Sequence, residues 1–524
     1  MNARSLALLI SFAVGLLSLS QEIVWVRMVS FGHEGRPQAF TLVLVAFLLG
    51  IAAGAAAGKA ICARFPDLRR PAGLLLLGAA AVDLAALYVA APLLAPYALA
   101  LPGLMLVIAA CAALKGALFP IVHQMGSRQD ERDPKLGRSI STVYTANVLG
   151  SALGPLLTGF WLLDTVNAET AMGLIAVSTA LLGCWVLALA PATSLKARLI
   201  GVGLSMAALF SCLSPPAVMA ELAAGSGDTS RLRHLIQNKH GVLHVLAEES
   251  PGQGDITFGG NVYDGRIQVD LGRNSNGLDR AYLVATLHAR PARVLVIGLS
   301  SGAWLRAIQG MPGVESIDVV EINPAYRTLI QRYPEVSPVL SHANTRIHID
   351  DGRRWLRRHP DARFDLIFMN TTFHWRSYAS LLLSQEFFGQ MKGHMAPGGV
   401  LAFNTTGSLD ALQTAQSLFP HVIRYGNFAY ASDQALVRDA QAEARLRASR
   451  IGDQPAFNDA LFVNNRAGQK LLQTPLTPAS EVLVNAKIKP EVISDLNLVP
   501  EFRHGRRPLY GAIDPWLPPS PHPD

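Results

Sequence analysis

Seven long apolar runs occupy the first 220 residues of this 524-residue chain and limit what it can fold into. Each run is close to the ~20 residues that a helix needs to cross about 30 Å of hydrocarbon. Buried helices of soluble proteins do not produce seven such runs in succession. The sequence therefore predicts an α-helical transmembrane domain over residues 1–220 in a lipid bilayer, with spans near residues 5–29, 38–61, 71–95, 98–122, 141–163, 168–190 and 198–220.

The net charge of +7 comes largely from short loops between the apolar runs, so no nucleic-acid partner is expected. The basic loops alternate with loops that carry little beyond Arg36. By the positive-inside rule the N-terminus is predicted to be cytoplasmic, and seven spans place the rest of the chain on the opposite side. The basic loop residues are Arg64, Arg69, Arg70, Arg128, Arg132, Lys135, Arg138, Lys196 and Arg198.

Four charged residues lie inside the predicted spans: Glu22, Arg27, Asp83 and Lys115. One interpretation is a polar pathway or substrate cavity. The other is that Glu22 pairs with Arg27, or Asp83 with Lys115, and ties helices together. Small residues that favour close helix packing recur at Gly50, Gly54, Gly58, Gly150 and Gly154.

The pattern changes after the last apolar run. Residues 221–278 contain short β-like segments punctuated by Asn-Gly and Asp-Gly turns, which predicts a small β-rich part. Strands and helices then alternate over 279–435, as in a Rossmann-like α/β core, and 436–524 form a C-terminal extension. All four cysteines lie in or beside the apolar runs and no HExxH motif is present, so no metal is expected.

Chemically useful residues follow several of the predicted strands. RVLVIG ends at Gly298 with Gly302 close behind, SIDVVE ends at Glu321, RIHIDD at Asp351 and FDLIFMN at Asn370. Because parallel strands end at one edge of a sheet, these residues are expected to meet there. A glycine turn followed by an acid after the second strand is typical of a nucleoside site, where the acid accepts ribose hydroxyls. The alternatives are a plain tight turn, a solvated acid, and Asp350 in place of Asp351.

Residues 240–430 resemble the spermidine synthase family. The segments ESPGQ, YDGRIQ, VLVIGLSSG, VVEINP, DDG, FDLIFMN, SQEFF and APGGVLAFN stand in the order and spacing of that family. With YTANVLGSALG in the fifth span and SDLNLVPEFRHG near the end, the chain is similar to bacterial membrane proteins that fuse a multi-span region to a spermidine synthase-like domain.

The resemblance implies a small β domain before a methyltransferase-type core, and polyamine biosynthesis as the context. S-adenosylmethionine or its decarboxylated form would be the co-substrate. Glu321 would hold its ribose and Asp351 its adenine amino group. Gln253 and Gln268 would surround the sulfur-bearing chain, and Ser300 would lie in the glycine loop. A homodimer and the bacterial inner membrane are also implied. A periplasmic domain conflicts with cofactor synthesis in the cytoplasm, so the side of the membrane stays open.

The sequence departs from the family where the amine substrate would bind. Asn370 replaces the carboxylate base after the fourth strand, and an amide is no general base at neutral pH. Ser300 and Ser301 replace the acid of the glycine loop. Tyr282 is followed by Leu283 and Val284 instead of the family's His and Glu. The nucleoside half of the site is therefore predicted to be kept and the diamine half to be changed.

The segment TTFHWRSY follows Asn370 and offers other chemistry. His374 has an ordinary pKa near 6.5 and is the candidate base. Arg376 is a candidate clamp for a carboxylate or phosphate, and Trp375 for stacking on a cation. The alternative is a packed loop with a surface arginine.

Three functions remain open from the sequence. The first is an aminopropyltransferase-like enzyme that transfers an aminopropyl or related alkyl group to an atypical acceptor, such as a polyamine or lipid-linked molecule. The second is acceptor-independent cleavage or cyclisation of S-adenosylmethionine. Both release methylthioadenosine. The third is a transporter or sensor that binds a nucleoside or polyamine without catalysis.

Overall fold

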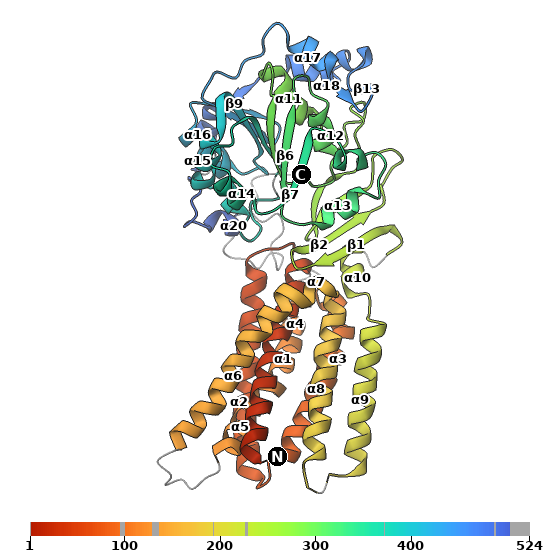
Figure 1. Cartoon of the computed structure of the whole chain (residues 1–524), viewed down its shortest axis with the longest axis vertical. Coiled ribbons are helices and arrows are strands. Elements are labelled where there is room, and N and C mark those ends of the chain that lie inside the picture. The colour runs from red at the N-terminus through yellow and green to blue at the C-terminus, as the bar shows by residue number, and fades with distance from the viewer. Residues whose placement is uncertain are drawn as a thin grey trace. The chain divides into compact units, whose positions relative to one another are not determined.

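A computed structural model describes residues 2–94, 100–127, 136–191, 193–225, 229–370, 372–486 and 489–503. The chain forms two compact units (Figure 1). Among the described residues, the first holds those up to Ser230 together with Gln237–Val242, and the second holds Arg231–Ile236 and 243–503. The divisions expected at residues 220, 278 and 435 stay predictions.

The first unit is helical. Its described helices are α1 (Ala3–Gly32), α2 (Gln38–Arg64), α3 (Arg69–Leu94), α4 (Ala100–Gly116), α5 (Leu118–Ser127), α6 (Leu136–Leu157), α7 (Leu163–Thr165), α8 (Ala168–Ala188), α9 (Leu195–Leu213) and α10 (Val218–Ala224), with a π-helical turn at Thr158–Leu162. Within the described residues, seven helical segments are long and apolar enough to cross a membrane, counting α4 with α5 and α6 with the turn and α7. The predicted transmembrane fold class is confirmed.

The last of these segments lies a few residues earlier than the sequence predicts. Ser194 caps α9, because its hydroxyl accepts a hydrogen bond from the backbone N–H of Ala197 at 3.3 Å. The helix ends at Leu213 rather than near residue 220. Pro215 and Pro216 follow directly, and a proline both disfavours helix in the preceding residue and lacks a backbone donor.

The glycine-rich stripes bring helix backbones into close approach, as predicted. A Cβ atom at Gly50, Gly54 or Gly58 of α2 would collide with backbone carbonyl oxygens of Ala109, Ala113 and Ala117. Gly150 and Gly154 of α6 lie in the same way against α1. Small residues thus allow dispersion contacts between helices that a larger side chain would prevent.

Two of the charges inside the bundle form a buried pair. Lys115 Nζ lies 2.6 Å from Asp83 Oδ2, and the two side chains are 1% and 0% exposed. Gln21 closes the ring, because its Oε1 accepts from Lys115 at 2.5 Å and its Nε2 donates to Asp83 at 2.7 Å. The cluster joins α1, α3 and α4. The predicted Asp83–Lys115 pair is confirmed.

The alternative pair of Glu22 with Arg27 is not found among the described residues. The Arg27 guanidinium instead donates to the backbone carbonyls of Asn238 and Lys239, at 2.9 and 2.8 Å. Both acceptors belong to the same compact unit as α1. Arg27 therefore serves a backbone turn and not a neighbouring carboxylate.

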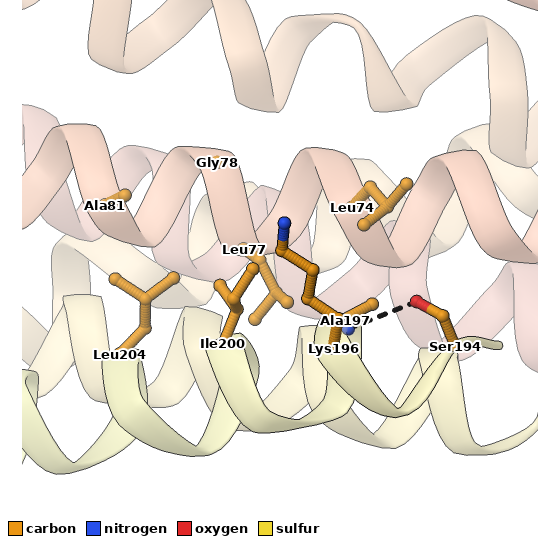
Figure 2. A pocket seen from close by; sticks show the side chains of 9 residues that line it. All are labelled: Leu74, Leu77, Gly78, Ala81, Ser194, Lys196, Ala197, Ile200 and Leu204. Carbon is orange, nitrogen blue, oxygen red and sulfur yellow. Dashed lines mark hydrogen bonds between the residues drawn. The ribbon is translucent and has the colours of Figure 1, made fainter.

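A cavity of about 360 Å³ opens between α3 and α9. Figure 2 shows Lys196 extending from α9 toward α3 among aliphatic side chains. The lining residues are Leu74, Leu77, Gly78, Ala81, Ser194, Lys196, Ala197, Ile200 and Leu204. This set contains one cation and no carboxylate, so it brings together no acid–base pair.

The second unit is built around two sheets. The smaller is antiparallel, in the order β1 (Leu232–Asn238), β2 (Gly241–Leu246), β3 (Ile256–Gly259), β4 (Val262–Arg266). The larger described sheet has the order β14 (Thr477–Pro478), β10 (His421–Tyr425), β11 (Phe428–Ser432), β9 (Met395–Asn404), β8 (Phe364–Met369), β5 (Arg293–Ile297), β6 (Ser316–Glu321), β7 (Thr345–Ile349). A short hairpin pairs β12 (Arg450–Ile451) with β13 (Gln454–Pro455).

Strands β9, β8, β5, β6 and β7 are parallel, whereas β11, β10 and β14 add on antiparallel. The chain order reverses between β5 and β8, which is where ligands bind in such sheets. This confirms the predicted α/β core.

Helices cover both faces of the large sheet. Successive residues of its strands point to opposite faces, and each face packs into its own hydrophobic cluster. In β5, Val294 and Val296 belong to one cluster, and Leu295 and Ile297 to the other. The described helices of this unit are α11 (Asp279–Leu287), α12 (Ala303–Gln309), α13 (Ala325–Ile330), α14 (Gly352–Arg358), α15 (Gln385–Gly393), α16 (Leu409–Leu418), α17 (Ala442–Ala448), α18 (Ala467–Gln473), α19 (Ala479–Val484) and α20 (Val499–Arg503).

Candidate nucleoside-binding site

The loop from β5 to α12 forms one wall of the candidate site. Gly298 has φ +91° and Gly302 has φ +79°, which L side chains rarely adopt. Ser300 and Ser301 donate from their hydroxyls to the backbone carbonyls of Asp264 and Arg266 in β4. The two serines therefore fasten the glycine loop to the small sheet.

Glu321 is the last residue of β6 and is 4% exposed. Its Oε2 accepts from the backbone N–H of Leu299 at 2.8 Å, and its Oε1 from Asn323 at 2.7 Å. Burial raises the pKa of Glu321 to about 7, which these backbone hydrogen bonds oppose. A third backbone hydrogen bond comes from Ile322. A carboxylate offers about four acceptor positions, so about one remains for a ligand.

A second acid that sequence reasoning did not assign lies beside Glu321. Asp264 of β4 accepts at Oδ2 from the Tyr326 hydroxyl at 2.5 Å. Burial raises the pKa of Asp264 to about 6, while Tyr326, Ser300 and the Arg376 charge oppose the rise. Asp264 in turn helps to raise the pKa of Glu321, so the two carboxyls are close enough to interact. Asp264 belongs to the motif YDGRIQ, but its Asp-Gly pair was interpreted as a turn and not as part of a site.

Asn370 follows β8 and lies at the same edge as Gly298. A Cβ at Gly298 would be 3.4 Å from the backbone oxygen of Asn370. The Asn370 side chain is half-buried, and its Oδ1 accepts from Asn404 Nδ2 at 3.0 Å. The structure thus places Asn370 at the point where the strand order reverses. Its replacement of the family's carboxylate base stays a prediction.

The loop after Asn370 brings His374, Trp375 and Arg376 into three different environments. His374 is 4% exposed, and its Nδ1 lies 2.8 Å from the hydroxyl of Thr406. Trp375 is buried with its ring 5.4 Å from that of Phe373. Arg376 donates to Thr372 at 2.6 Å and extends to Gly260 in the turn between β3 and β4. Thr371, part of the segment TTFHWRSY, lies outside the described residues.

The two acids after β7 have structural contacts. Asp351 caps α14, because its Oδ1 accepts from the backbone N–H of Arg354 at 2.8 Å. Asp350 pairs with Arg354 and Arg358, which together with its other contacts hold its pKa below the usual range despite burial. Asp351 still has acceptor positions left, so its adenine contact stays a prediction.

Gln253 and Gln268 lie in neighbouring turns of the small β region. A Cβ at Gly254 would meet the backbone oxygen of Ile267 and the Cβ of Gln268, which places the two turns against each other. Gln268 is 8% exposed, and its Oε1 accepts from the backbone N–H of Asp270 at 2.9 Å. The backbone oxygen of Gln253 accepts from the Ser275 hydroxyl at 2.8 Å. Their contact with a sulfur-bearing chain stays a prediction.

The C-terminal segment is held on the core by two acids. Asp495 receives both terminal nitrogens of Arg353, at 2.8 and 2.6 Å, and Glu501 accepts from the backbone and hydroxyl of Ser380. The extension also contributes β14 to the large sheet and α17 and α18 to its core. In the described part of the chain, no group of three or more His, Cys, Asp or Glu side chains is arranged to hold a metal ion.

Taken together, the structure gathers Asp264, Ser300, Glu321, Tyr326 and Arg376 around the glycine loop. Asn370 joins them through Gly298. The group contains the carboxylates of Glu321 and Asp264, the Arg376 guanidinium close enough to Asp264 to act on its pKa, and the Asn370 amide. Such a site can accept hydrogen bonds from hydroxyls and donate hydrogen bonds to an anionic group.

Comparison with known proteins supports this view of the second unit. Residues 281–422 match the spermine/spermidine synthase domain. Polyamine aminopropyltransferase 2 of Streptomyces coelicolor is 28% identical over 323 residues, which is 58% of this chain and 54% of the relative. Spermine synthase of Arabidopsis thaliana is 28% identical over 169 residues, or 32% of this chain and 46% of the relative. The chain therefore spans about half the length of these curated relatives.

A solved spermidine synthase in complex with the transition-state analogue AdoDATO has a TM-score of 0.35 at 17% identity, covering 44% of this chain and 81% of that one. Human methyltransferase-like protein 13 in complex with SAH has a TM-score of 0.28 at 19% identity, covering 34% of this chain and 92% of that one. The sequence matches and the strand order lead to one conclusion. This chain carries a spermine/spermidine synthase domain together with an N-terminal region of long apolar helices.

Proposed function

We propose that the protein is a membrane-anchored transferase that binds S-adenosylmethionine or its decarboxylated form through the ribose. It passes an aminopropyl or related alkyl group to an atypical acceptor and releases methylthioadenosine. Its surroundings are the bacterial inner membrane, with the N-terminus in the cytoplasm. The acceptor class stays open between a polyamine and a lipid-linked molecule.

The observation that carries this proposal is the position of Glu321. Its carboxylate closes β6, next to the glycine loop, and keeps about one acceptor position beside three backbone hydrogen bonds. A ribose hydroxyl of a nucleoside can donate to this position. The matched span 281–422 contains this residue and every catalytic candidate.

The reaction would proceed by displacement at carbon. The nucleophile of the acceptor attacks the carbon beside the sulfonium, and the carbon–sulfur bond breaks as its electron pair goes to sulfur. Methylthioadenosine leaves as a neutral thioether, and the proton of the nucleophile passes to His374. Asn370 cannot take this proton, because an amide is not basic at neutral pH. His374 follows Asn370 by four residues in the loop after β8, and this position supports its assignment as base.

The replacement of a carboxylate by Asn370 also supports a second candidate. Asn370 carries no charge that would attract an external amine at this strand end, and cleavage or cyclisation of S-adenosylmethionine needs no external acceptor. The methionine carboxylate or amine would then act as the internal nucleophile. A non-catalytic role in transport or sensing has less support. Asp83 and Lys115, two of the charged residues that suggested a polar pathway, form a buried ion pair with each other.

The test is an incubation of the purified full-length protein with S-adenosylmethionine, and separately with decarboxylated S-adenosylmethionine and diamines. Products are identified by mass spectrometry. Product that depends on an acceptor supports transfer, and methylthioadenosine without an acceptor supports the second candidate. Tight nucleoside binding without any turnover supports a binding protein.

Two matched pairs of variants locate the activity. Glu321→Gln is compared with Glu315→Gln, an exposed acid just before the opposite end of the same strand. His374→Ala is compared with His342→Ala, which is exposed before β7. Loss of binding in Glu321→Gln and of turnover in His374→Ala supports the site. Unchanged nucleoside affinity in Glu321→Gln contradicts it.

A further inference from the structure

We infer that the group of the substrate lying at the end of β8 is a carboxylate, because the protein holds Asn370 with its NH2 group outward. The inference rests on the proposed function, since it takes the bound molecule to be an adenosyl sulfonium. It deepens that function by naming a carboxylate, on the tail of the nucleoside or on the second substrate, as the group that Asn370 binds.

A chain of amides leads from Asn370 to a guanidinium. Asn404, at the end of β9, donates from Nδ2 to Asn370 Oδ1 at 3.0 Å. Asn427, in the turn between β10 and β11, donates from Nδ2 to Asn404 Oδ1 at 2.9 Å. Arg280 of α11 donates to Asn427 Oδ1. The Arg280 guanidinium is itself positioned 5.0 Å from the ring centroid of Trp304.

The direction of this chain is set from both ends by groups that only donate. The backbone N–H of Thr406 donates to Asn404 Oδ1 at 2.8 Å, and a backbone N–H cannot accept. The Arg280 guanidinium likewise has no acceptor, so Asn427 must present its oxygen there. Asn404 must therefore point its NH2 group toward Asn370, and Asn370 must accept this hydrogen bond with its side-chain oxygen. Two independent donors impose the same orientation.

The Asn370 NH2 group is what remains for a ligand. It makes no hydrogen bond to another described residue, and the side chain is only half-buried. Asn370 lies beside Gly298 at the point where the strand order reverses, which is where the ligand crevice of such a sheet is found. Thus a hydrogen-bond donor occupies the position at which the family places an acceptor.

This change of polarity selects the substrate. An ammonium group offers only donors, so facing the Asn370 NH2 it gains nothing and loses hydration. A carboxylate offers acceptors to the same NH2 group. Arg376, in the same loop, adds a positive charge near the site, since this charge lowers the pKa of Asp264. The carboxylate belongs either to the tail of the nucleoside or to the second substrate, and the two sources are separable by experiment.

The experiment measures affinities by calorimetry on the full-length protein in detergent. The ligands are methylthioadenosine, S-adenosylmethionine and decarboxylated S-adenosylmethionine. One hydrogen bond to a charged group corresponds to roughly 10- to 100-fold in affinity, so the wild type should favour the intact molecule over the decarboxylated one by about that ratio. A second arm compares 4-aminobutyrate with 1,4-diaminobutane in the presence of methylthioadenosine.

Two variants invert the outward group by different routes. Asn370→Asp keeps an oxygen for Asn404 and replaces the outward NH2 by a charged oxygen. Asn404→Asp leaves residue 370 unchanged but accepts a hydrogen bond from it, so the Asn370 amide turns over and presents its oxygen. Both should lower the preference for the carboxylate by roughly 10-fold or more. The matched control is Asn344→Asp, which lies before β7 at the opposite edge of the sheet and should leave the preference unchanged.

Methylthioadenosine tests the proposed nucleoside site separately from the carboxylate contact of Asn370, because it lacks the amino-acid tail. If the wild type does not bind it, the proposed nucleoside site is wrong and the inference falls with it. If all variants bind methylthioadenosine equally, the nucleoside site is supported. The preference for the ligand that carries a carboxylate then tests the inference by itself. A wild type that favours the decarboxylated molecule and 1,4-diaminobutane overturns the inference, as does a preference that neither variant changes. A preference for 4-aminobutyrate alone assigns the carboxylate to the second substrate.

Discussion

Removal of the Lys115 charge should destabilise the helical unit strongly. The perturbation is Lys115→Met, which keeps most of the aliphatic side chain and deletes the ammonium. Asp83 would then stay buried with hydrogen bonding from Gln21 but without a counter-charge. A charge left unpaired in a low-dielectric interior costs far more than a missing hydrogen bond.

The size of the effect follows from the burial of the pair. Both side chains are at most 1% exposed, so water cannot replace the lost ammonium. Breaking a buried pair costs about 3–5 kcal/mol, and the lower end applies to a bundle whose unfolded helices still find partners in detergent. With roughly 2–4 °C per kcal/mol for a unit of this size, the midpoint of thermal unfolding should fall by roughly 6–12 °C.

A second variant distinguishes lost charge balance from lost volume. In the double variant Lys115→Met/Asp83→Asn both charges are gone, and the amide introduced at position 83 still accepts a hydrogen bond from Gln21. The double variant then lacks one hydrogen bond to the Gln21 oxygen, which costs about 1–2 kcal/mol. It should therefore unfold at a higher temperature than Lys115→Met alone.

The assay is thermal unfolding of the purified protein in detergent, followed by intrinsic tryptophan fluorescence. Lys196→Met serves as the matched control, because Lys196 is exposed on α9 and should change the midpoint little. A fall of less than about 2 °C in Lys115→Met would refute the reasoning, because it corresponds to at most about 1 kcal/mol. A double variant less stable than the single one would refute it too.

Three further outcomes follow from the second unit. Because the pKa of Glu321 is raised to about 7 and ribose hydroxyls favour its ionised form, methylthioadenosine binding at pH 7 should release roughly half a proton, and affinity should fall as the pH drops below 7. Calorimetry in buffers of different ionisation enthalpy measures this release, which Glu321→Gln should abolish. Gly298→Ala forces a side chain into φ +91° and should cost about 1–2 kcal/mol in the free energy of unfolding, whereas Gly389→Ala, in a helix with open space around it, should be neutral or stabilising. Arg353→Ala should cost about 1 kcal/mol, because its partner Asp495 is partly exposed, and hydrogen exchange should rise in residues 489–503. The Arg353 contact lowers the pKa of Asp495, so the same increase in exchange should occur in the wild type as the pH falls below about 4.

Local patterns were enough to predict the helices, the strands and the acid at the end of β6. A span of apolar residues is set by the thickness of a bilayer, and a strand followed by a glycine turn is set by backbone geometry over a few residues. The position of Glu321 at the end of β6 and that of Asn370 after β8 were therefore predicted from the sequence, while their roles in a site stay predictions. The end of α9 was misjudged, because hydropathy alone continued past two prolines.

Pairings between distant residues were decided only by the tertiary structure. Asp83 and Lys115 meet because α3 and α4 pack together, whereas Glu22 and Arg27, five positions apart on one helix, do not pair. The orientation of Asn370 depends on Asn404 at the end of β9, Asn427 in the turn between β10 and β11, and Arg280 of an earlier helix, which come together only when the sheet order is set. A sequence states which groups are present. Whether an amide presents its oxygen or its NH2 group to a ligand is determined by the neighbours that it contacts in the folded protein.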